Sequence, residues 1–382
     1  MDFSFSREQL AVRDECLKFA HDEIAPVRER LEGDPAARTA LFEKACAQGL
    51  FLLTVPAANG GRFVDTTAFT LGISALSRVD AGFGVSVGIM NVLLEGIARF
   101  GTDAQKKRYI ENFISGEWAT GAFAVTEDES GSDVRSMKTR AERSPSDPDT
   151  FVIRGEKCFI TNGDIADVCF VFARTGDGPS DITCFLVEKG DPGWNVSGVH
   201  RKMGQTTVAL VSLSFKDCRV SKDRVLGKVN DGFAVALAML DSGRIGVAAQ
   251  AIGLAEAAME AAVGYAQKRV QFGKPIAKNQ AVAFKLSDMQ VKLEASKLLL
   301  YRACWLKDQG KPFGLETSIA KLHATESANE IANEAVQIHG GNGYIKDYPL
   351  ERYYRDARVM TIYEGTSEIQ RLVISRNILK DK

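Results

Sequence analysis

The sequence predicts a mainly helical protein with a smaller β domain in its middle. Three observations support this: apolar residues recur with helical spacing up to about residue 120, with strand spacing over 121–228, and with helical spacing again over 229–382. With 382 residues, 45% hydrophobic and 25% charged, the chain is long enough for several domains with buried cores. We therefore expect an N-terminal helical domain at 1–120, a central β domain at 121–228 and a C-terminal helical bundle at 229–382.

The first region has the signals of helices. Ser6 and Gln9 form a candidate capping box at the start of a helix. Gly60-Gly61 breaks the chain further on. Helical patterns then cover 39–50, 67–100 and 103–115.

The middle region alternates apolar and polar residues, as half-buried strands do. Val211, Leu213 and Phe215 alternate with two serines. The residues at 144–149 are rich in Ser, Asp and Pro, which predicts an exposed hairpin connection. Further β-rich runs lie at 151–161, 168–174 and 182–188. An antiparallel barrel or sandwich of about 100 residues fits this region.

The last region returns to helical spacing, and its apolar stripes predict a bundle. Three glycines at 340–343 are expected to end the third helix, and Thr366 or Ser367 can cap the last one. The candidate helices cover 232–269, 279–309, 315–339 and 366–379.

Composition argues against several classes of function. The net charge is −1, which gives no basic surplus for nucleic acid or an anionic membrane. The seven cysteines form no C-x-x-C pair and the four histidines have no metal-ligand spacing, so we expect free thiols and no metal site. We expect no signal peptide at the N-terminus and no membrane span, because the longest apolar stretches fall short of ~18 residues. We expect a cytoplasmic protein.

Four segments could carry chemistry. Glu364 stands between Tyr363 and Gly365 just before a helix, where a dry pocket would raise its pKa and let it act as a base. The alternative is an ordinary helix-start glutamate. The segment 123–133 offers hydroxyls and backbone N–H groups to a polar cofactor, or is an ordinary loop.

The other two segments could bind phosphate. Arg269 could contact a phosphate with both guanidinium arms, or could be a surface arginine at a helix end. The glycines at 340, 341 and 343 would let backbone N–H groups approach a pyrophosphate, or would simply stop a helix. They do not form G-x-G-x-x-G and follow no strand, so they are not a Rossmann fingerprint.

Taken together, the order, spacing and flanking sequence of these segments resemble the acyl-CoA dehydrogenase family from about residue 3 to 380. The runs LDSGRIG at 240–246 and QAVAFKLSDM at 280–289 add to the resemblance, which is greatest to the short-chain and bacterial branches. It implies an N-terminal helical domain, a central β domain, a C-terminal four-helix bundle, non-covalent FAD and a homotetramer. The implied reaction is dehydrogenation of an acyl-CoA to the 2,3-enoyl-CoA, with an electron-transfer flavoprotein as acceptor.

The resemblance also implies roles for individual residues. Glu364 falls on the base that takes the α-proton while the β-hydride passes to flavin N5, and its backbone N–H would hold the thioester oxygen. One branch carries the base at the position of Gly243, where glycine cannot serve. Where the family usually has proline, this chain has Asp128, which we expect to loosen the flavin loop.

The implied contact residues form two sets. Those for FAD, some belonging to a neighbouring subunit's cofactor, are Phe123, Val125, Thr126, Ser132, Phe159, Ile160, Thr161, Arg269, Gln271, Phe272, Gln280, Gln337, Gly340, Gly341, Thr366 and Glu368. Those for the acyl-CoA are Ser132, Asp241, Arg244, Tyr363, Gly365 and Arg376, with Gly84 and Gly88 at the floor of the acyl pocket.

Two glycines bear on the choice of substrate. Gly84 and Gly88 lie four residues apart, hence on one helix face, and suggest a roomy pocket for branched, cyclic or aromatic acyl groups. The alternative is that other side chains refill the space. Phe83, in place of the arginine of glutaryl-type members, argues against a dicarboxylyl substrate. Other functions on this fold are an acyl-CoA oxidase, a carrier-protein thioester dehydrogenase, and a non-catalytic flavin- or thioester-binding protein.

Overall fold

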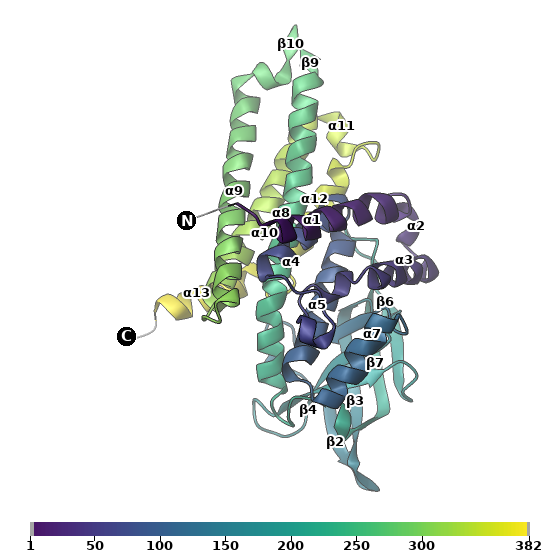
Figure 1. The fold of residues 1–382 in the computed structure, drawn as a ribbon. Helices are drawn as coiled ribbons and strands as arrows, with labels where there is room; N and C mark the ends of the chain where they lie inside the picture. Colours follow the sequence, from purple (N-terminus) through teal and green to yellow (C-terminus); the bar gives the residue numbers. More distant parts are fainter. Residues whose placement is uncertain (1–3, 380–382) are drawn as a thin grey trace.

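The chain runs through helices, then a β-sheet, then a bundle of long helices, in a computed structural model that describes residues 4–379 (Figure 1). The N-terminal elements are α1 (Arg7–Phe19), η1 (Ala20–Ile24), α2 (Arg28–Leu31), α3 (Pro35–Ala47), η2 (Leu50–Leu52), η3 (Ala57–Asn59), α4 (Thr66–Val79), α5 (Ala81–Phe100), α6 (Asp103–Gln105), η4 (Lys106–Ile110) and α7 (Glu111–Ser115).

Side chains at the helix starts explain the boundaries in this region. The predicted capping box is confirmed, because Gln9 N donates to Ser6 Oγ at 3.2 Å and Ser6 N donates to Gln9 Oε1 at 2.9 Å. The helical pattern predicted over 67–100 is confirmed, and it is divided into two helices. Asp80 separates α4 from α5, and its carboxylate accepts from Phe83 N at 2.8 Å as the N-cap of α5.

The central sheet has eight strands. The strands are β1 (Gly121–Ala124), β2 (Arg140–Ser144), β3 (Asp147–Thr161), β4 (Val168–Arg174), β5 (Ile182–Glu188), β6 (Trp194–Val199), β7 (Leu210–Ser221) and β8 (Val225–Leu226), with η5 (Val134–Ser136) and η6 (Lys222–Arg224) between them. Their order is β6-β7-β3-β2-β4-β5-β8, with β1 beside β4.

Among the described strands, β6 and β8 lie at the two ends of the path and do not pair with each other, so the sheet is not a closed barrel. It is not wholly antiparallel either, because β1 runs parallel to β4. The β2–β3 hairpin lies between these two strands in sequence, and this intervening chain allows β4 to return in the direction of β1. The predicted hairpin connection is confirmed, since Ser144 pairs with Asp147.

Three long helices dominate the C-terminal region. They are α8 (Gly232–Lys268), α9 (Gln280–Asp308) and α10 (Gly314–His339), and α10 packs against both others. The smaller elements are β9 (Val270–Gln271), β10 (Lys274–Pro275), η7 (Ile276–Lys278), α11 (Gly341–Tyr344), α12 (Leu350–Arg358), η8 (Val359–Thr361) and α13 (Ser367–Ile378). The pattern reading missed α12. As predicted, Thr366 caps α13, because its hydroxyl accepts from Ile369 N at 3.3 Å.

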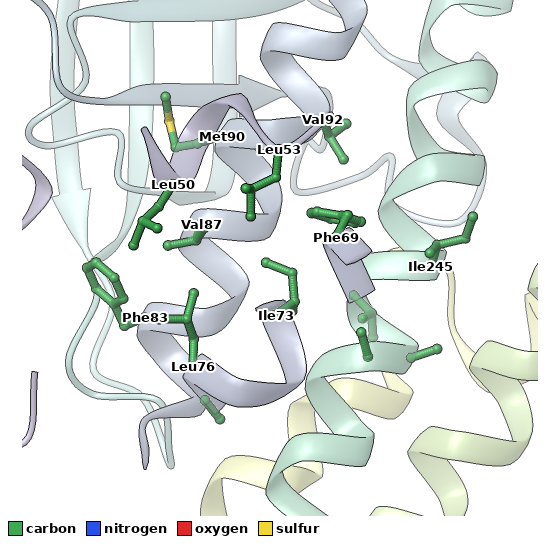
Figure 2. Close-up of a cluster of buried hydrophobic side chains, with 14 of the residues drawn as sticks. Leu50, Leu53, Phe69, Ile73, Leu76, Phe83, Val87, Met90, Val92 and Ile245 are labelled. Atoms are coloured by element: carbon green, nitrogen blue, oxygen red, sulfur yellow. The ribbon is translucent and has the colours of Figure 1, made fainter. Parts of the chain in front are cut away.

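The core between α4, α5 and α8 sets the place of the candidate site. Figure 2 shows Phe69 and Ile73 of α4, Val87 of α5 and Ile245 of α8 in this cluster. Two hydrogen bonds fix an antiparallel register between α5 and α8. Gln250 Nε2 donates to Ala81 O at 2.6 Å near one end, and Ser242 Oγ donates to Glu95 Oε1 at 3.3 Å near the other. The middle of α5, around Gly88, therefore lies opposite the part of α8 around Gly246.

By length and composition alone, α5 and α8 could each cross a membrane, contrary to the expectation that no apolar stretch was long enough. In the most apolar window of α5, 78% of the residues are buried inside the protein, and in that of α8, 67% are buried. Central helices of a large core carry apolar residues all round, so composition alone does not distinguish them from spans.

Candidate active site

Glu364 occupies a strained turn between η8 and α13. Its φ is 52°, and that of Gly365, the next residue, is 89°. A non-glycine residue in the left-handed region costs about 1–3 kcal/mol and persists only when its surroundings hold it there.

Buried donors hold this turn. Lys321 Nζ on α10 donates to Gly365 O at 2.8 Å. Gln370 Nε2 on α13 donates to the same carbonyl at 2.9 Å and to Glu364 O at 3.2 Å. On the other side, the hydroxyl of Tyr363 donates to Gln250 Oε1 of α8 at 2.5 Å.

The carboxyl group of Glu364 lies in a space left by a glycine. A Cβ on Gly243 of α8 would come within 2.5 Å of Glu364 Oε2, so any larger residue would displace the carboxyl group. Glu364 Oε2 is buried and has no hydrogen-bond partner among the described residues. This group is therefore free to exchange a proton with a bound molecule.

Burial and nearby charge act in opposite directions on this group. Burial raises the pKa of Glu364 to about 7, although the positive charges of Arg244 and Lys321 oppose the rise. Burial also lowers the pKa of Lys321 to about 8, against the influence of Glu364. Arg244 is buried and paired with Asp241 at 2.6 Å. A buried acid with a pKa near 7 is suited to act as a base at neutral pH.

A buried ion pair joins the two segments that the resemblance assigns to the flavin. Lys157 is fully buried, and its Nζ donates to Val125 O at 3.1 Å and to Glu127 Oε1 at 2.7 Å. Cys158 N also donates to Thr126 O at 2.9 Å. These bonds bring the segment after β1 against the end of β3.

The surface made by these segments offers an aromatic side chain and free hydroxyl groups. Phe159 has a φ of 57° and is 55% exposed, and although its ring lies 5.0 Å from that of His200, part of its surface is available for a planar group. Thr126, Ser132 and Thr161 have hydroxyls without a hydrogen bond to any described residue, which leaves them free for the polar edge of a cofactor. Phe123, in the first segment, is partly buried, and Ile160, in the second, is fully buried.

The residues assigned to the ADP half lie elsewhere. Arg269, Gln271 and Phe272 belong to the β9–β10 hairpin at the tip of the bundle, at the end away from the sheet (Figure 1). Phe272 is 97% exposed. Gln280 begins α9, while Gln337, Gly340 and Gly341 lie at the end of α10.

Their chemistry suits a pyrophosphate. The side chains of Arg269, Gln280 and Gln337 are exposed and bond to no other residue in the described chain. A Cβ on Gly340 or Gly341 would meet nothing within 4 Å, so a ligand could approach the backbone. Glu368 and Arg376 are exposed on α13, and no interaction in the described chain joins Arg376 to the Glu364 group.

The two pocket-floor glycines differ in what surrounds them. A Cβ on Gly84 would overlap Ser77 Oγ of α4, so helix packing accounts for that glycine and the expected open space is absent there. A Cβ on Gly88 would meet nothing within 4 Å, although Gly88 itself is buried. Internal space therefore lies beside Gly88.

Pattern reading missed several residues of the site. Lys321, Gln370, Gln250 and Gln205 all contact the Tyr363–Gly365 turn, the last by donating to the Tyr363 hydroxyl at 3.2 Å. The sequence contains a signal for one of them, Lys321. It lies three and seven residues before Ala324 and Ala328 of α10, so helical spacing puts it on the buried face of that helix.

Three domain models of one family match successive parts of the chain. They describe the acyl-CoA dehydrogenase N-terminal domain at residues 6–117, the middle domain at 122–218 and the C-terminal domain at 230–379.

Individual proteins match over nearly the whole chain. An acyl-CoA dehydrogenase of Bacillus subtilis (strain 168) is 44% identical over 377 residues, covering 98% of each chain. An acryloyl-CoA reductase (NADH) of Anaerotignum propionicum is 40% identical over 382 residues, covering 100% of this chain and 96% of that one. The structure of an acyl-CoA dehydrogenase complexed with FAD from Bacillus anthracis has a TM-score of 0.93 at 31% identity, covering 98% of this chain and 67% of that one.

Proposed function

The chain belongs to the acyl-CoA dehydrogenase family, whose members are FAD-dependent oxidoreductases of CH–CH groups, and from this premise we propose that it oxidises an acyl-CoA thioester to the 2,3-enoyl-CoA. The observation that carries the proposal is the buried carboxyl group of Glu364, which has an oxygen without a partner among the described residues and a pKa of about 7.

In this proposal the ionised Glu364 takes the α-proton of the acyl group. Its carboxylate oxygen Oε2 is buried, so little water has to be displaced from that oxygen when the acyl group binds. The backbone N–H of Glu364 donates to no acceptor in the described chain, and it could hold the thioester oxygen as negative charge develops there. Asp241 and Arg244 are proposed to contact the CoA portion, with Tyr363 and Gly365 bordering the acyl group.

The flavin would be held by Phe123, Val125, Thr126, Ser132, Phe159, Ile160, Thr161, Thr366 and Glu368, with the pyrophosphate end bound by the β9–β10 hairpin and the end of α10, in part from a neighbouring subunit. Bound FAD would accept the hydride that leaves the β carbon. We propose an electron-transfer flavoprotein as the acceptor and a cytoplasmic location, the latter supported by seven buried, unpaired cysteines.

The test is the visible spectrum of the purified protein during anaerobic addition of short, long, branched, cyclic and aromatic acyl-CoAs. Flavin bands that bleach with one of them support the reaction and identify the acyl group. A protein that cannot be loaded with FAD, or whose flavin bleaches with neither acyl-CoA nor carrier-protein thioesters, contradicts it. Rapid reoxidation by air would favour the oxidase alternative.

The space beside Gly88 leads to a prediction about substrate size. The α5–α8 register puts this space opposite Gly246, one helical turn from Gly243, where the Glu364 carboxyl group lies. Gly88→Leu should lower kcat/KM for the preferred branched or aromatic acyl-CoA by about 10–200-fold, because the added side chain takes the room of the acyl group.

Butyryl-CoA serves as the internal control, and its kcat/KM should change by less than about threefold. Equal losses on all substrates would mean that the variant is damaged generally. A wild-type enzyme whose best substrate is butyryl-CoA would refute the roomy pocket.

We also propose that the protein is a homo-oligomer, with the family's tetramer as the expected state. Four large apolar residues of α9, each more than half exposed, follow one another at intervals of seven: Phe284, Val291, Leu298 and Trp305. Residues seven apart share a helix face, and such an exposed row is typical of an interface.

Placing charge on this row should separate the subunits. The double variant Val291→Glu, Leu298→Glu should shift the mass measured by light scattering toward that of one chain, because ionised carboxylates resist burial against an apolar partner. Gln290→Glu, at an exposed neighbouring position on α9, is the matched control and should keep the wild-type mass. A double variant of unchanged mass would place the interface elsewhere.

A further inference from the structure

Lys321 is a buried cation whose burial the fold alone does not explain. It lies on α10 with 0% of its surface exposed, beside Ala320, Ala324 and Thr325. Its Nζ donates to Gly365 O at 2.8 Å. Gln370 already donates to that carbonyl, so the turn would keep a donor without a charged one. An ammonium group costs more to bury than a neutral donor, which suggests that its charge is used.

The charge of Lys321 acts on Glu364 above all. Burial lowers the pKa of Lys321. Among the acids whose negative charge opposes this lowering, Glu364 has the largest effect, ahead of Glu326 on α10 and Glu368 on α13. From α8, Arg244 also faces this group, and although it is paired with Asp241 its positive charge lowers the pKa of Glu364 more than that of Lys321 does. Arg371 of α13 lies 3.8 Å from Glu326 and so partly offsets that acid.

We propose that Lys321 is a positioning residue for the base: its hydrogen bond fixes the left-handed turn that carries Glu364, and its positive charge, together with that of Arg244, favours the ionised form of the Glu364 carboxylate. The inference rests on the proposed function only in calling Glu364 the base. Its electrostatic part concerns the two side chains and can be measured without turnover.

Three substitutions separate the hydrogen bond from the charge. Lys321→Arg keeps both, Lys321→Gln keeps a donor without charge, and Lys321→Met keeps neither. Removing the positive charge favours the protonated form of Glu364, so its titration should move to higher pH in the Gln and Met variants and stay in place in the Arg variant. Lys292→Met removes a half-exposed lysine paired with Glu330 and serves as the control.

The titration is followed by ¹³C NMR of protein labelled at glutamate Cδ, with the Glu364 signal assigned by its loss in Glu364→Gln. We expect a wild-type midpoint of about 7. If Lys321→Gln and Lys321→Met both titrate with the wild-type midpoint, the inference is wrong. Should Lys321→Met fail to fold, the Glu364 midpoints of Lys321→Gln and Lys321→Arg still show whether the positive charge at this position shifts the titration.

The pH profile of kcat/KM is the second readout. The acidic limb should move to higher pH in Lys321→Gln, so that its rate relative to wild type falls by on the order of tenfold between pH 9 and pH 6.5. A constant ratio would mean a merely structural role. A protein that turns over no thioester would refute the proposed function, while the NMR titration would still test Lys321.

Discussion

Replacing Glu364 by glutamine should lower the rate of flavin reduction by about 10²–10⁴-fold. The amide has nearly the same shape but cannot accept the α-proton. Binding of FAD should remain, because the turn is held through its backbone carbonyls and the Tyr363 hydroxyl and not through the carboxyl group. Anaerobic stopped-flow absorbance with the preferred acyl-CoA measures the effect.

The same substitution should stabilise the protein at high pH. Burial raises the pKa of Glu364 from 4.5 to about 7, so between these values the folded state binds more protons than the unfolded state. Stability is therefore lost as pH rises through this window, by up to about 3 kcal/mol. Glu364→Gln should melt at a higher temperature than wild type at pH 8 and nearly the same temperature at pH 4.5.

Glu330→Gln, an exposed glutamate of α10, is the control and should change neither rate nor melting temperature appreciably. If Glu364→Gln still reduces its flavin at the wild-type rate, the base is another residue.

The second large effect is expected at Lys157. Lys157→Met should lower the free energy of unfolding by about 3–5 kcal/mol, because it leaves the Glu127 carboxylate buried without its cation. Burial opposes ionisation of Glu127, but the charge and hydrogen bond of Lys157 outweigh it and keep the pKa of Glu127 below its ordinary value. Denaturant unfolding measures this loss.

The Lys157 variant should also bind FAD more weakly, since the bond to Val125 O that joins the two flavin segments is gone. Lys138→Met is the matched control: Lys138 pairs with Glu129 in the same loop, but both are mostly exposed, so its loss should cost less than about 1 kcal/mol. Equal stabilities of the two variants would show that the buried pair does not hold the loop.

The features that the sequence predicted depend on neighbours along the chain. The Ser6–Gln9 box and the Thr366 cap involve residues three apart, and the β2–β3 hairpin closes over two residues. Asp80 was missed because its capping side chain lies inside a long apolar run. Glu364 could be proposed as a base from its neighbours Tyr363 and Gly365 and from the resemblance.

What was missed depends on contacts between distant residues. The bond from Lys321 to Gly365 joins residues 44 apart in sequence, and the one from Gln205 to Tyr363 joins residues 158 apart. The pair Gly84 and Gly88 shows the same limit. Their spacing placed them on one face, but only the packing of α4 distinguishes the filled side from the open one.

The position of the β9–β10 hairpin has a consequence for how activity depends on protein concentration. On the proposed assembly, the hairpin completes the nucleotide site of another subunit, so dilution below the dissociation constant would release cofactor as well as subunits. Chains with different defects could then rescue each other. A mixture of Glu364→Gln chains and chains with Arg269→Ala should contain sites that combine an intact base with an intact hairpin, and so regain activity that neither chain has alone.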